Sequence, residues 1–157
     1  MSDIRPTTLT VIERDGKILL GLKKRGFAEG VWNGFGGKVM PGETEEAAMV
    51  RELFEESGLK ALEYEKIGYL EFRLSDEADR IVVNIYRVHK FLGEPIETEE
   101  MVPKWFPLDG IPYELMWPDD PHWLPLALEG KKFQGHFEIE NKQTITDYRI
   151  EIVDGIL

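Results

Sequence analysis

Cysteine is absent from the 157-residue sequence, so the chain has no disulfide bond, no thiolate metal ligand and no thiol nucleophile. This absence suits a reducing compartment, and we expect a cytoplasmic protein. No apolar run follows a basic start, so no secretory signal is predicted. The longest apolar stretches are far too short to span a bilayer. Internal repeats and low-complexity tracts are lacking too, which predicts a single domain over residues 1–157.

Positive charge is scarce. The chain has 30 Asp and Glu residues against 19 Lys and Arg, for a formal net charge of -11. Such a surface repels nucleic-acid polymers and anionic membranes, so neither is expected as a partner. It also repels a free triphosphate. If the substrate is a nucleotide, divalent cations must reverse the local field.

The order of side chains predicts a mixed β-sheet with two helices, which is an α/β sandwich. A hairpin is expected at 7–13 and 17–23, and the glycine-rich stretch 24–37 is expected to be a loop. Helices are expected at 44–57, ended by Gly58, and at 120–131, with Asp120 as the cap before Pro121. The remaining strands are expected at 64–74, 80–91, 104–107, 133–139 and 144–153.

Three carboxylates gather on one face of the helix expected at 44–57. At about 100° per residue, Glu52, Glu55 and Glu56 fall within an arc of about 100°. The opposite side is expected to be the core face and contains Ala47, Val50, Leu53 and Phe54. Alone, three glutamates are explained by a solvated acidic face. They also suit a hard divalent cation, which takes oxygen ligands and would cancel their repulsion.

The spacing around these glutamates decides between the two interpretations. Gly37 is followed after five residues by Glu43, and after seven more by Arg51-Glu52-Leu53-Phe54-Glu55-Glu56-Ser57-Gly58-Leu59. This segment resembles the Nudix box at every defined position. The resemblance implies the Nudix fold, a mixed β-sheet sandwiched between helices (an α/β/α sandwich), and cleavage of a diphosphate linkage with Mg²⁺, or with Mn²⁺ in its place.

The same resemblance implies roles for individual residues. The implied metal ligands are the carbonyl of Gly36 and the carboxylates of Glu52, Glu55, Glu56 and Glu100. Read alone, the segment 97–100 is a solvated loop, and only the resemblance selects Glu100. Arg51 is implied to pair with Glu43 and so to fix the loop against the helix. Water attacks a phosphorus, and the general base stays open among Glu52, Glu56 and Glu100.

Outside the box, segments in the same order over nearly the whole chain resemble the oxidised purine nucleoside triphosphatases of the 8-oxo-dGTP type. They lie at 23–27, 32–39, 105–106, 116–120, 131–133 and 147–148. The resemblance implies a monomer that converts 8-oxo-dGTP to the monophosphate plus pyrophosphate and so sanitises the nucleotide pool. It leaves open whether 2-oxo-dATP is a second substrate.

Carried over residue by residue, the resemblance implies a base pocket. Asn33, Asp119 and Asp120 would hydrogen-bond the purine edge, and Trp117 would stack on the base. The other implied substrate contacts are Thr8 and Lys23 at the sugar side, Phe27 and Phe72 in the pocket wall, and Phe35, Gly36, Gly37, Lys38 and Pro118. Structural alternatives exist for several of them: a helix cap for Asp120, core positions for Trp117, Phe27 and Phe72, a solvated strand end for Lys23 and a turn for Asn33.

The dipeptide Asp119-Asp120 carries an expectation of its own. Adjacent carboxylates in a partly dry pocket should titrate as a coupled pair with one pKa raised. The protonated group can then donate a hydrogen bond while the ionised group accepts one. The family often has another aromatic residue or methionine where this chain has Leu74 and Ile81. These two residues leave the breadth of base choice open.

Two other functions remain open. The first is another Nudix hydrolase that acts on unmodified or methylated purine nucleotides or on other diphosphate-linked compounds. The second is a nucleotide-binding Nudix module without catalysis, whose expected signature is a broken box. Because Glu52, Glu55 and Glu56 are all present, this second alternative ranks low.

Overall fold

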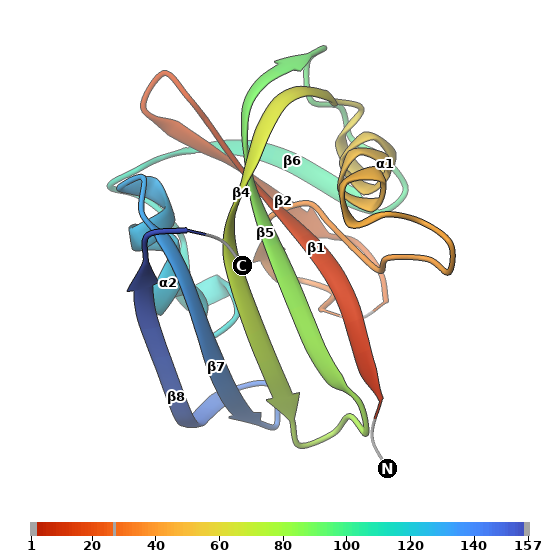
Figure 1. Ribbon diagram of the computed structural model, residues 1–157. Coiled ribbons are helices and arrows are strands. Elements are labelled where there is room, and N and C mark those ends of the chain that lie inside the picture. The colour runs from red at the N-terminus through yellow and green to blue at the C-terminus, as the bar shows by residue number, and fades with distance from the viewer. Residues whose placement is uncertain (1–2, 27, 156–157) are drawn as a thin grey trace.

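The computed structural model describes residues 3–26 and 28–155. Within these residues, eight strands and three helical segments are found (Figure 1). The strands are β1 Ile4–Arg14, β2 Lys17–Lys23, β3 Trp32–Asn33, β4 Lys60–Leu74, β5 Arg80–Leu92, β6 Met101–Pro107, β7 Lys132–Glu140 and β8 Thr144–Val153. The helices are α1 Glu45–Ser57, the short 3-10 helix η1 Tyr113–Leu115, and α2 Asp120–Leu128.

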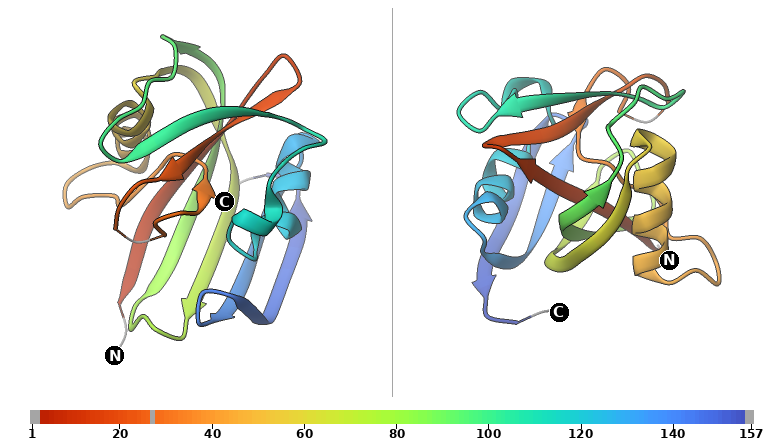
Figure 2. Two further views of the ribbon diagram at one scale, coloured as in Figure 1. Left: turned by 180° about the vertical axis from the view of Figure 1, so that it is seen from behind. Right: turned by 90° about the horizontal axis from the view of Figure 1, so that it is seen from above.

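The strands form one mixed sheet in the order β3-β2-β1-β5-β4-β7-β8, with β6 paired to β2. β1 runs parallel to β5, and β4 runs parallel to β7. The hairpin partners β1 and β2 share only two residue pairs next to their turn. The two strands therefore diverge, and β2 and β6 cross over the long strands (Figure 2).

The two α-helices cover opposite faces of the sheet (Figure 2), which confirms the expected α/β/α sandwich. One core cluster lies under α2 and includes Leu70, Trp123 and Phe137. The other lies under α1 and includes Phe35 and Leu53. None of the helices in the described part of the chain is long and apolar enough to cross a membrane.

Several expected boundaries need correction. The stretch 24–37 contains β3, because Trp32 and Asn33 pair with β2. The strand expected at 104–107 begins at Met101, since all seven of its residues pair with β2. The helix expected to reach residue 131 ends at Leu128. It stops there because Gly130 takes the left-handed conformation, with φ of 81°, and turns the chain.

The limits of α1 agree with the sequence, but its core face was only partly predicted. Thr44 caps the start by accepting from the Ala47 amide at 3.1 Å, and Gly58 ends the helix with φ of 80°. The buried residues of α1 are Ala48, Met49, Leu53, Glu56 and Ser57. Phe54 is 59% exposed and Ala47 is also exposed, so their assignment to the core was wrong. The side of α1 that contains Glu52 and Glu56 faces the protein, because the loop that contains Gly36 and Gly37 packs on these two glutamates.

Candidate active site

A cavity of about 530 Å³ is lined by β1, β4, β5, the loop 33–38 and the segment before α2. Most of the residues that the sequence predicts for substrate contact line it. They are Thr8, Lys23, Asn33, Gly36, Gly37, Lys38, Phe72, Trp117, Asp119 and Asp120. Glu56 of α1 reaches the same cavity, as do Leu74 and Ile81. The fold thus brings part of the acidic helix and the aspartate pair to one space.

Two of the predicted contacts do not line the cavity, and a third cannot be placed. Phe27 lies outside the described residues. Phe35 does not line the cavity, because its ring is fully buried in the core cluster under α1. Its carbonyl accepts hydrogen bonds from the amide and the hydroxyl of Thr10, both at 2.9 Å, so the loop holds Phe35 as part of the fold. Pro118 is half-buried and lies beside the cavity-lining Trp117 without lining the cavity itself.

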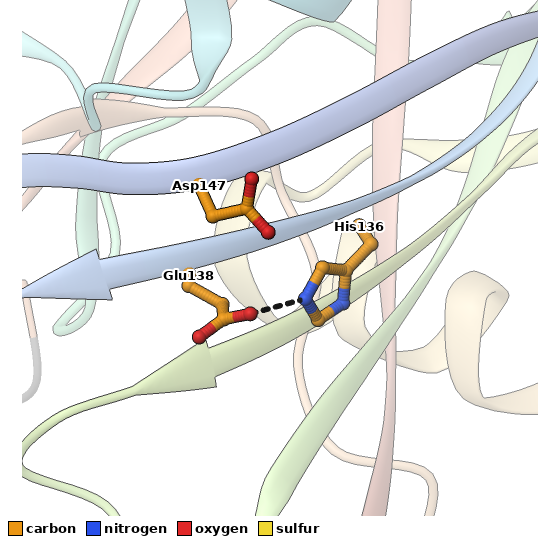
Figure 3. A group of neighbouring side chains, drawn as sticks. All are labelled: His136, Glu138 and Asp147. Atoms are coloured by element: carbon orange, nitrogen blue, oxygen red, sulfur yellow. Dashed lines mark hydrogen bonds and ion pairs between the residues drawn. The ribbon is translucent and has the colours of Figure 1, made fainter.

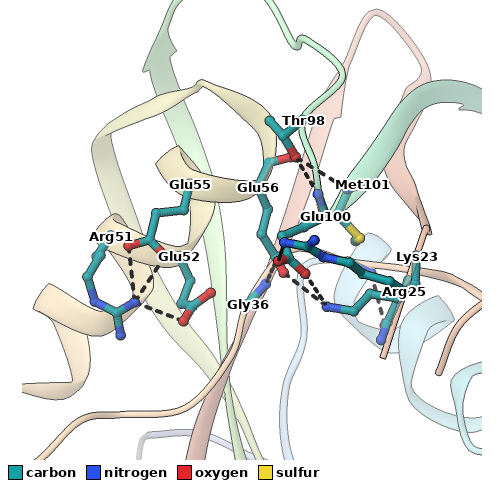
Figure 4. A network of polar contacts seen from close by, with 12 residues as sticks. Lys23, Arg25, Gly36, Arg51, Glu52, Glu55, Glu56, Thr98, Glu100 and Met101 are labelled. Carbon is teal, nitrogen blue, oxygen red and sulfur yellow. Dashed lines mark hydrogen bonds and ion pairs between the residues drawn. The ribbon is translucent and has the colours of Figure 1, made fainter. Parts of the chain in front are cut away.

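Glu56 is the most deeply placed glutamate of α1, at 5% exposure. Its Oε1 accepts from the Gly36 amide at 2.9 Å, and its Oε2 lies 3.7 Å from Nζ of Lys23 (Figure 4). Burial raises the pKa of Glu56 to about 7, although the Gly36 amide and the Lys23 ammonium both act to lower it. The neighbouring carboxylates of Glu52 and Glu100 raise it further.

Arg51 ties the loop before α1 to the helix. Its guanidinium donates to both carboxylate oxygens of Glu43, at 2.7 and 2.9 Å, and to the carbonyl of Lys38 at 3.1 Å. Its third nitrogen donates to Glu52 at 2.9 Å and lies 3.3 Å from Glu55. The hydrogen bond from Arg51 lowers the pKa of Glu43 to about 2. The Glu43–Arg51 pair expected from the sequence is therefore present.

Two glycines let the loop backbone lie directly against other groups. A Cβ on Gly37 would lie 2.6 Å from Cδ of Glu52, and a Cβ on Gly36 would lie 1.8 Å from the carbonyl oxygen of Thr8. At Gly36 the neighbouring atoms are backbone, so no side chain fits there, whereas at Gly37 a side chain would displace the Glu52 carboxylate. Glu55 lies further out, with 54% of its side chain exposed, and it does not line the cavity.

Lys23 and Arg25 form ion pairs with Glu100 (Figure 4). Arg25 donates to Glu100 at 3.0 Å, and Nζ of Lys23 lies 3.3 Å from the other oxygen of Glu100. The hydrogen bond from Arg25 is the main reason that the pKa of Glu100 is lowered. Lys23 was expected at the sugar side of a substrate. In the structure Lys23 lines the cavity and lies between Glu56 and Glu100, whose carboxylates attract its ammonium.

Asp119 and Asp120 are both buried, at 4% and 3% exposure. The indole nitrogen of Trp123 donates to Oδ2 of Asp119 at 2.8 Å, and the carboxyl groups of Asp119 and Asp120 influence each other's pKa. Oδ2 of Asp120 has no hydrogen-bond partner. Burial raises the pKa of both groups, and the charge of Asp119 raises that of Asp120 further. The expected coupled pair with a raised pKa is therefore found.

Helix capping does not account for this pair. Asp119 is the residue that precedes α2, and its side chain makes no capping hydrogen bond. Asp120 is the first helical residue and not the cap. Phe72 fits both of its interpretations, since it belongs to the core cluster under α2 and lines the cavity. The hydroxyl of Thr8 is buried without a partner at the cavity wall.

Sequence reasoning missed several residues of the cavity. The role of Trp123 as donor to Asp119 had a signal, because residues four apart on a helix face each other. Arg5 and Glu77 also line the cavity and had none. Arg5 of β1 pairs with Asp79 at 3.1 Å, which joins β1 to the turn before β5.

One group of metal-ligating side chains lies away from the cavity. His136 and Glu138 of β7 and Asp147 of β8 bring one ligand atom each within 4.8 Å of one another (Figure 3). Nε2 of His136 is 3.1 Å from Oε2 of Glu138. None of the three lines the cavity, so this group is separate from the glutamates of α1.

The carboxylates predicted as metal ligands fit a hard divalent cation, although of the four only Glu56 lines the cavity. Glu52, Glu55, Glu56 and Glu100 offer only oxygen atoms, which Mg²⁺ and Ca²⁺ prefer. Burial is the main cause of the raised pKa of Glu56, and the repulsion from Glu52 and Glu100 that adds to it would be relieved by a cation.

Comparisons with known proteins agree with this site. The sequence pattern of the NUDIX domain matches residues 3–127. The chain is 46% identical over 155 residues to the oxidized purine nucleoside triphosphate hydrolase of Mus musculus, covering 99% of each chain. It is 45% identical to the Danio rerio protein of the same name, covering 95% of this chain and 96% of the relative.

The fold has solved counterparts. The crystal structure of a MutT protein from Bacillus halodurans superposes with a TM-score of 0.83 at 23% identity, covering 94% of this chain and 97% of the other. At that identity the likeness concerns the fold alone. Nudix hydrolases generally use a divalent metal ion, which agrees with the oxygen donors of α1. The chain therefore belongs to the Nudix family of hydrolases.

Proposed function

We propose that this protein hydrolyses oxidised purine nucleoside triphosphates, 8-oxo-dGTP foremost, to the monophosphate plus pyrophosphate, and thereby sanitises the nucleotide pool. The observation that carries the proposal is one cavity that receives Glu56 of the acidic helix and the buried Asp119–Asp120 pair. The names of the relatives from Mus musculus and Danio rerio support the same activity.

The metal is proposed to be Mg²⁺, with Mn²⁺ able to replace it. Its proposed ligands are the carboxylates of Glu52, Glu55, Glu56 and Glu100 and the carbonyl of Gly36. When bound, such an ion neutralises charge on the phosphates and lowers the pKa of the attacking water. Gly36 already holds Glu56 through its amide. The base that takes the proton of the water is proposed to be one of the carboxylates of Glu52, Glu56 and Glu100.

The aspartate pair is proposed to recognise the base. One carboxyl group is ionised and accepts from the N–H groups of the purine, while its protonated neighbour donates to a ring nitrogen or oxygen. The free Oδ2 of Asp120 supports this role, because a buried carboxyl oxygen without a partner is costly unless a ligand supplies one. Trp117 and Phe72 contribute the apolar faces of the pocket.

We further propose that residues 1–157 act as a single domain and as a monomer in the cytoplasm. The partner is a small nucleotide, and neither a nucleic-acid polymer nor a membrane is expected to bind. The net charge of -11 supports this choice, because it disfavours approach to either polyanion. A metal-bound nucleotide approaches with much of its negative charge neutralised.

A substrate panel tests the proposal. Purified protein in Mg²⁺ is given 8-oxo-dGTP, 2-oxo-dATP, dGTP, a methylated purine triphosphate and a dinucleoside polyphosphate, and pyrophosphate, orthophosphate and monophosphate are measured. We expect pyrophosphate plus monophosphate, with the highest kcat/KM for 8-oxo-dGTP. Orthophosphate as the sole product contradicts the proposal. Binding without turnover in Mg²⁺, equal in wild type and Glu56→Ala, would identify a non-catalytic module instead.

A further inference from the structure

An aromatic ladder of three rings crosses the sheet beneath α2. Phe72 of β4 pairs in register with Phe137 of β7, which pairs with Tyr148 of β8. The rings of Phe72 and Phe137 stack at 5.5 Å with an interplanar angle of 15°, and those of Phe137 and Tyr148 stack at 5.5 Å and 5°. The ladder begins at the cavity wall with Phe72 and ends at the surface, where Tyr148 is 48% exposed.

The first turn of α2 carries the aspartate pair but lacks the usual helix-start hydrogen bond. The side chain of Asp119 does not cap the helix, because its carboxylate is turned to Trp123 and Asp120. A side-chain cap normally stabilises the start of a helix. Without such a cap, the first turn of α2 depends on the packing of its side chains for its stability.

Two ring contacts fix this turn from neighbouring positions. Trp123 packs its ring on Phe133 at 5.9 Å within the core. His122 packs its ring on Tyr148 at 4.5 Å and lies 6.1 Å from Phe137. The first contact is buried, whereas the second lies at the surface, since His122 is exposed. His122 also donates its backbone amide to the carbonyl of Asp119 at 2.9 Å, which couples its position to the pair.

We propose that the ring contact between His122 and Tyr148 is a positioning contact for substrate selection. It holds the first turn of α2 at a fixed height above the aromatic ladder, and the Asp119–Asp120 pair moves with that turn. Because Phe72 belongs to the ladder and lines the cavity, this height sets the space between the two walls that receive the base. The inference rests on the proposed function for its choice of substrate.

The test removes each ring and then restores it. In His122→Ala and Tyr148→Ala we expect the KM for 8-oxo-dGTP to rise about 5-fold with kcat changed less than about 2-fold, because the metal end of the cavity is untouched. The preference for 8-oxo-dGTP over dGTP should fall by a similar factor. The double variant should be no worse than either single variant, since both remove one contact. His122→Phe and Tyr148→Phe keep a ring and should stay close to wild type.

His89→Ala is the matched control. His89 is an exposed histidine of β5 whose ring lies 3.1 Å from a carboxylate oxygen of Glu65, with no contact to the ladder. Its removal should leave KM and the preference for 8-oxo-dGTP unchanged. The proposal is overturned if the folded Ala variants keep the wild-type KM and preference, if the double variant is additive, or if the ring-retaining variants fail equally.

A second readout does not depend on the substrate. Amide hydrogen exchange of residues 120–124 in nucleotide-free protein should quicken in His122→Ala and Tyr148→Ala, and not in His122→Phe or His89→Ala. Unchanged exchange in both Ala variants overturns the proposal even if 8-oxo-dGTP is no substrate. A wild-type protein inactive on all oxidised purine nucleotides would reject the proposed function, while the exchange experiment still tests the contact.

Discussion

At the scale of single residues, the site depends on the missing Cβ of Gly37 and on the indole N–H of Trp123. Gly37 lies so close to Glu52 that the helix carboxylate occupies the place of a side chain. Trp123 supplies the one N–H that fixes Asp119. The glycine was identifiable from the motif and its spacing, and the aspartate pair from the resemblance of segments outside the motif. The indole contact was missed although Asp119 and Trp123 are four residues apart, because a tryptophan on an apolar helix face was interpreted as core packing alone.

Gly37→Ala is expected to weaken metal binding. The new Cβ would lie 2.6 Å from Cδ of Glu52, so the carboxylate must turn away. Displacing a metal ligand in this way should lower Mg²⁺ affinity about 10-fold or more, measured by titration calorimetry. Gly155→Ala is the matched control, because nothing lies within 4 Å of its Cβ position. Equal Mg²⁺ affinity in both variants would refute the close packing of Gly37 on Glu52.

Trp123→Phe is expected to raise the pKa of Asp119. The indole N–H stabilises the ionised carboxylate and so lowers this pKa, and phenylalanine keeps the ring while removing the donor. The measurement is a ¹³C NMR titration of the aspartate carboxyl groups in nucleotide-free protein. An unchanged or lower pKa of Asp119 in Trp123→Phe would show that the hydrogen bond from the indole does not stabilise the ionised carboxylate.

At the scale of elements, α1 shows which part of a helix its sequence determines. Its start at Thr44 and its end at Gly58 follow from local chemistry, and both were predicted. The orientation of α1 was not predicted. The carboxylates of Glu52 and Glu56 are covered by the backbone of Gly36 and Gly37, and a backbone contact leaves no hydrophobic pattern in the sequence. Phe54 was predicted to be a core residue because it lies opposite the glutamates on the helix, but its side chain is exposed.

Neighbouring residues of α1 give a direct test of that orientation. Phe54→Ser should change the free energy of unfolding by less than about 0.5 kcal/mol, because the side chain is 59% exposed. Leu53→Ala should cost about 2–5 kcal/mol, because Leu53 is fully buried. Urea denaturation of the metal-free protein measures both. A larger loss in Phe54→Ser than in Leu53→Ala would place the core on the wrong face of α1.

At the scale of the whole molecule, the sheet assembles the site from segments distant in sequence. The composition of the chain and its alternating strands predicted the sandwich, and the motif predicted which residues meet at α1. The parallel pairing of β4 with β7 places Phe72 beside Phe137, and nothing in either strand alone specifies this partner. The contact of Arg5 with Asp79 depends on another long-range pairing, that of β1 with β5, which explains why it was missed.

The pH dependence of stability follows from Glu56. Its pKa rises from 4.5 in the unfolded chain to about 7 in the fold. Between these values the folded state binds more protons, so the free energy of unfolding falls as the pH rises from about 5 to about 7. In metal-free buffer Glu56 should contribute at most about 3 kcal/mol to that fall.

Glu56→Gln isolates this contribution, because Asp119 and Asp120 act in the same direction in both proteins. Urea denaturation with a chelator at several pH values should show a flatter pH profile in the variant. Identical profiles in the two proteins would mean that the Glu56 carboxyl group is not desolvated as described.

In the proposed mechanism, Glu56 at one part of the cavity is needed for turnover, whereas Asp119 at another part of the same cavity selects the base. The direct measurement is kcat/KM for 8-oxo-dGTP and for dGTP in Mg²⁺ with wild type, Glu56→Gln and Asp119→Asn. Glu56→Gln should lower both values by a similar factor, on the order of 100-fold, and leave their ratio unchanged. Asp119→Asn should lower the preference for 8-oxo-dGTP by about 10-fold or more. A normal turnover in Glu56→Gln, or an intact preference in Asp119→Asn, would contradict the claim.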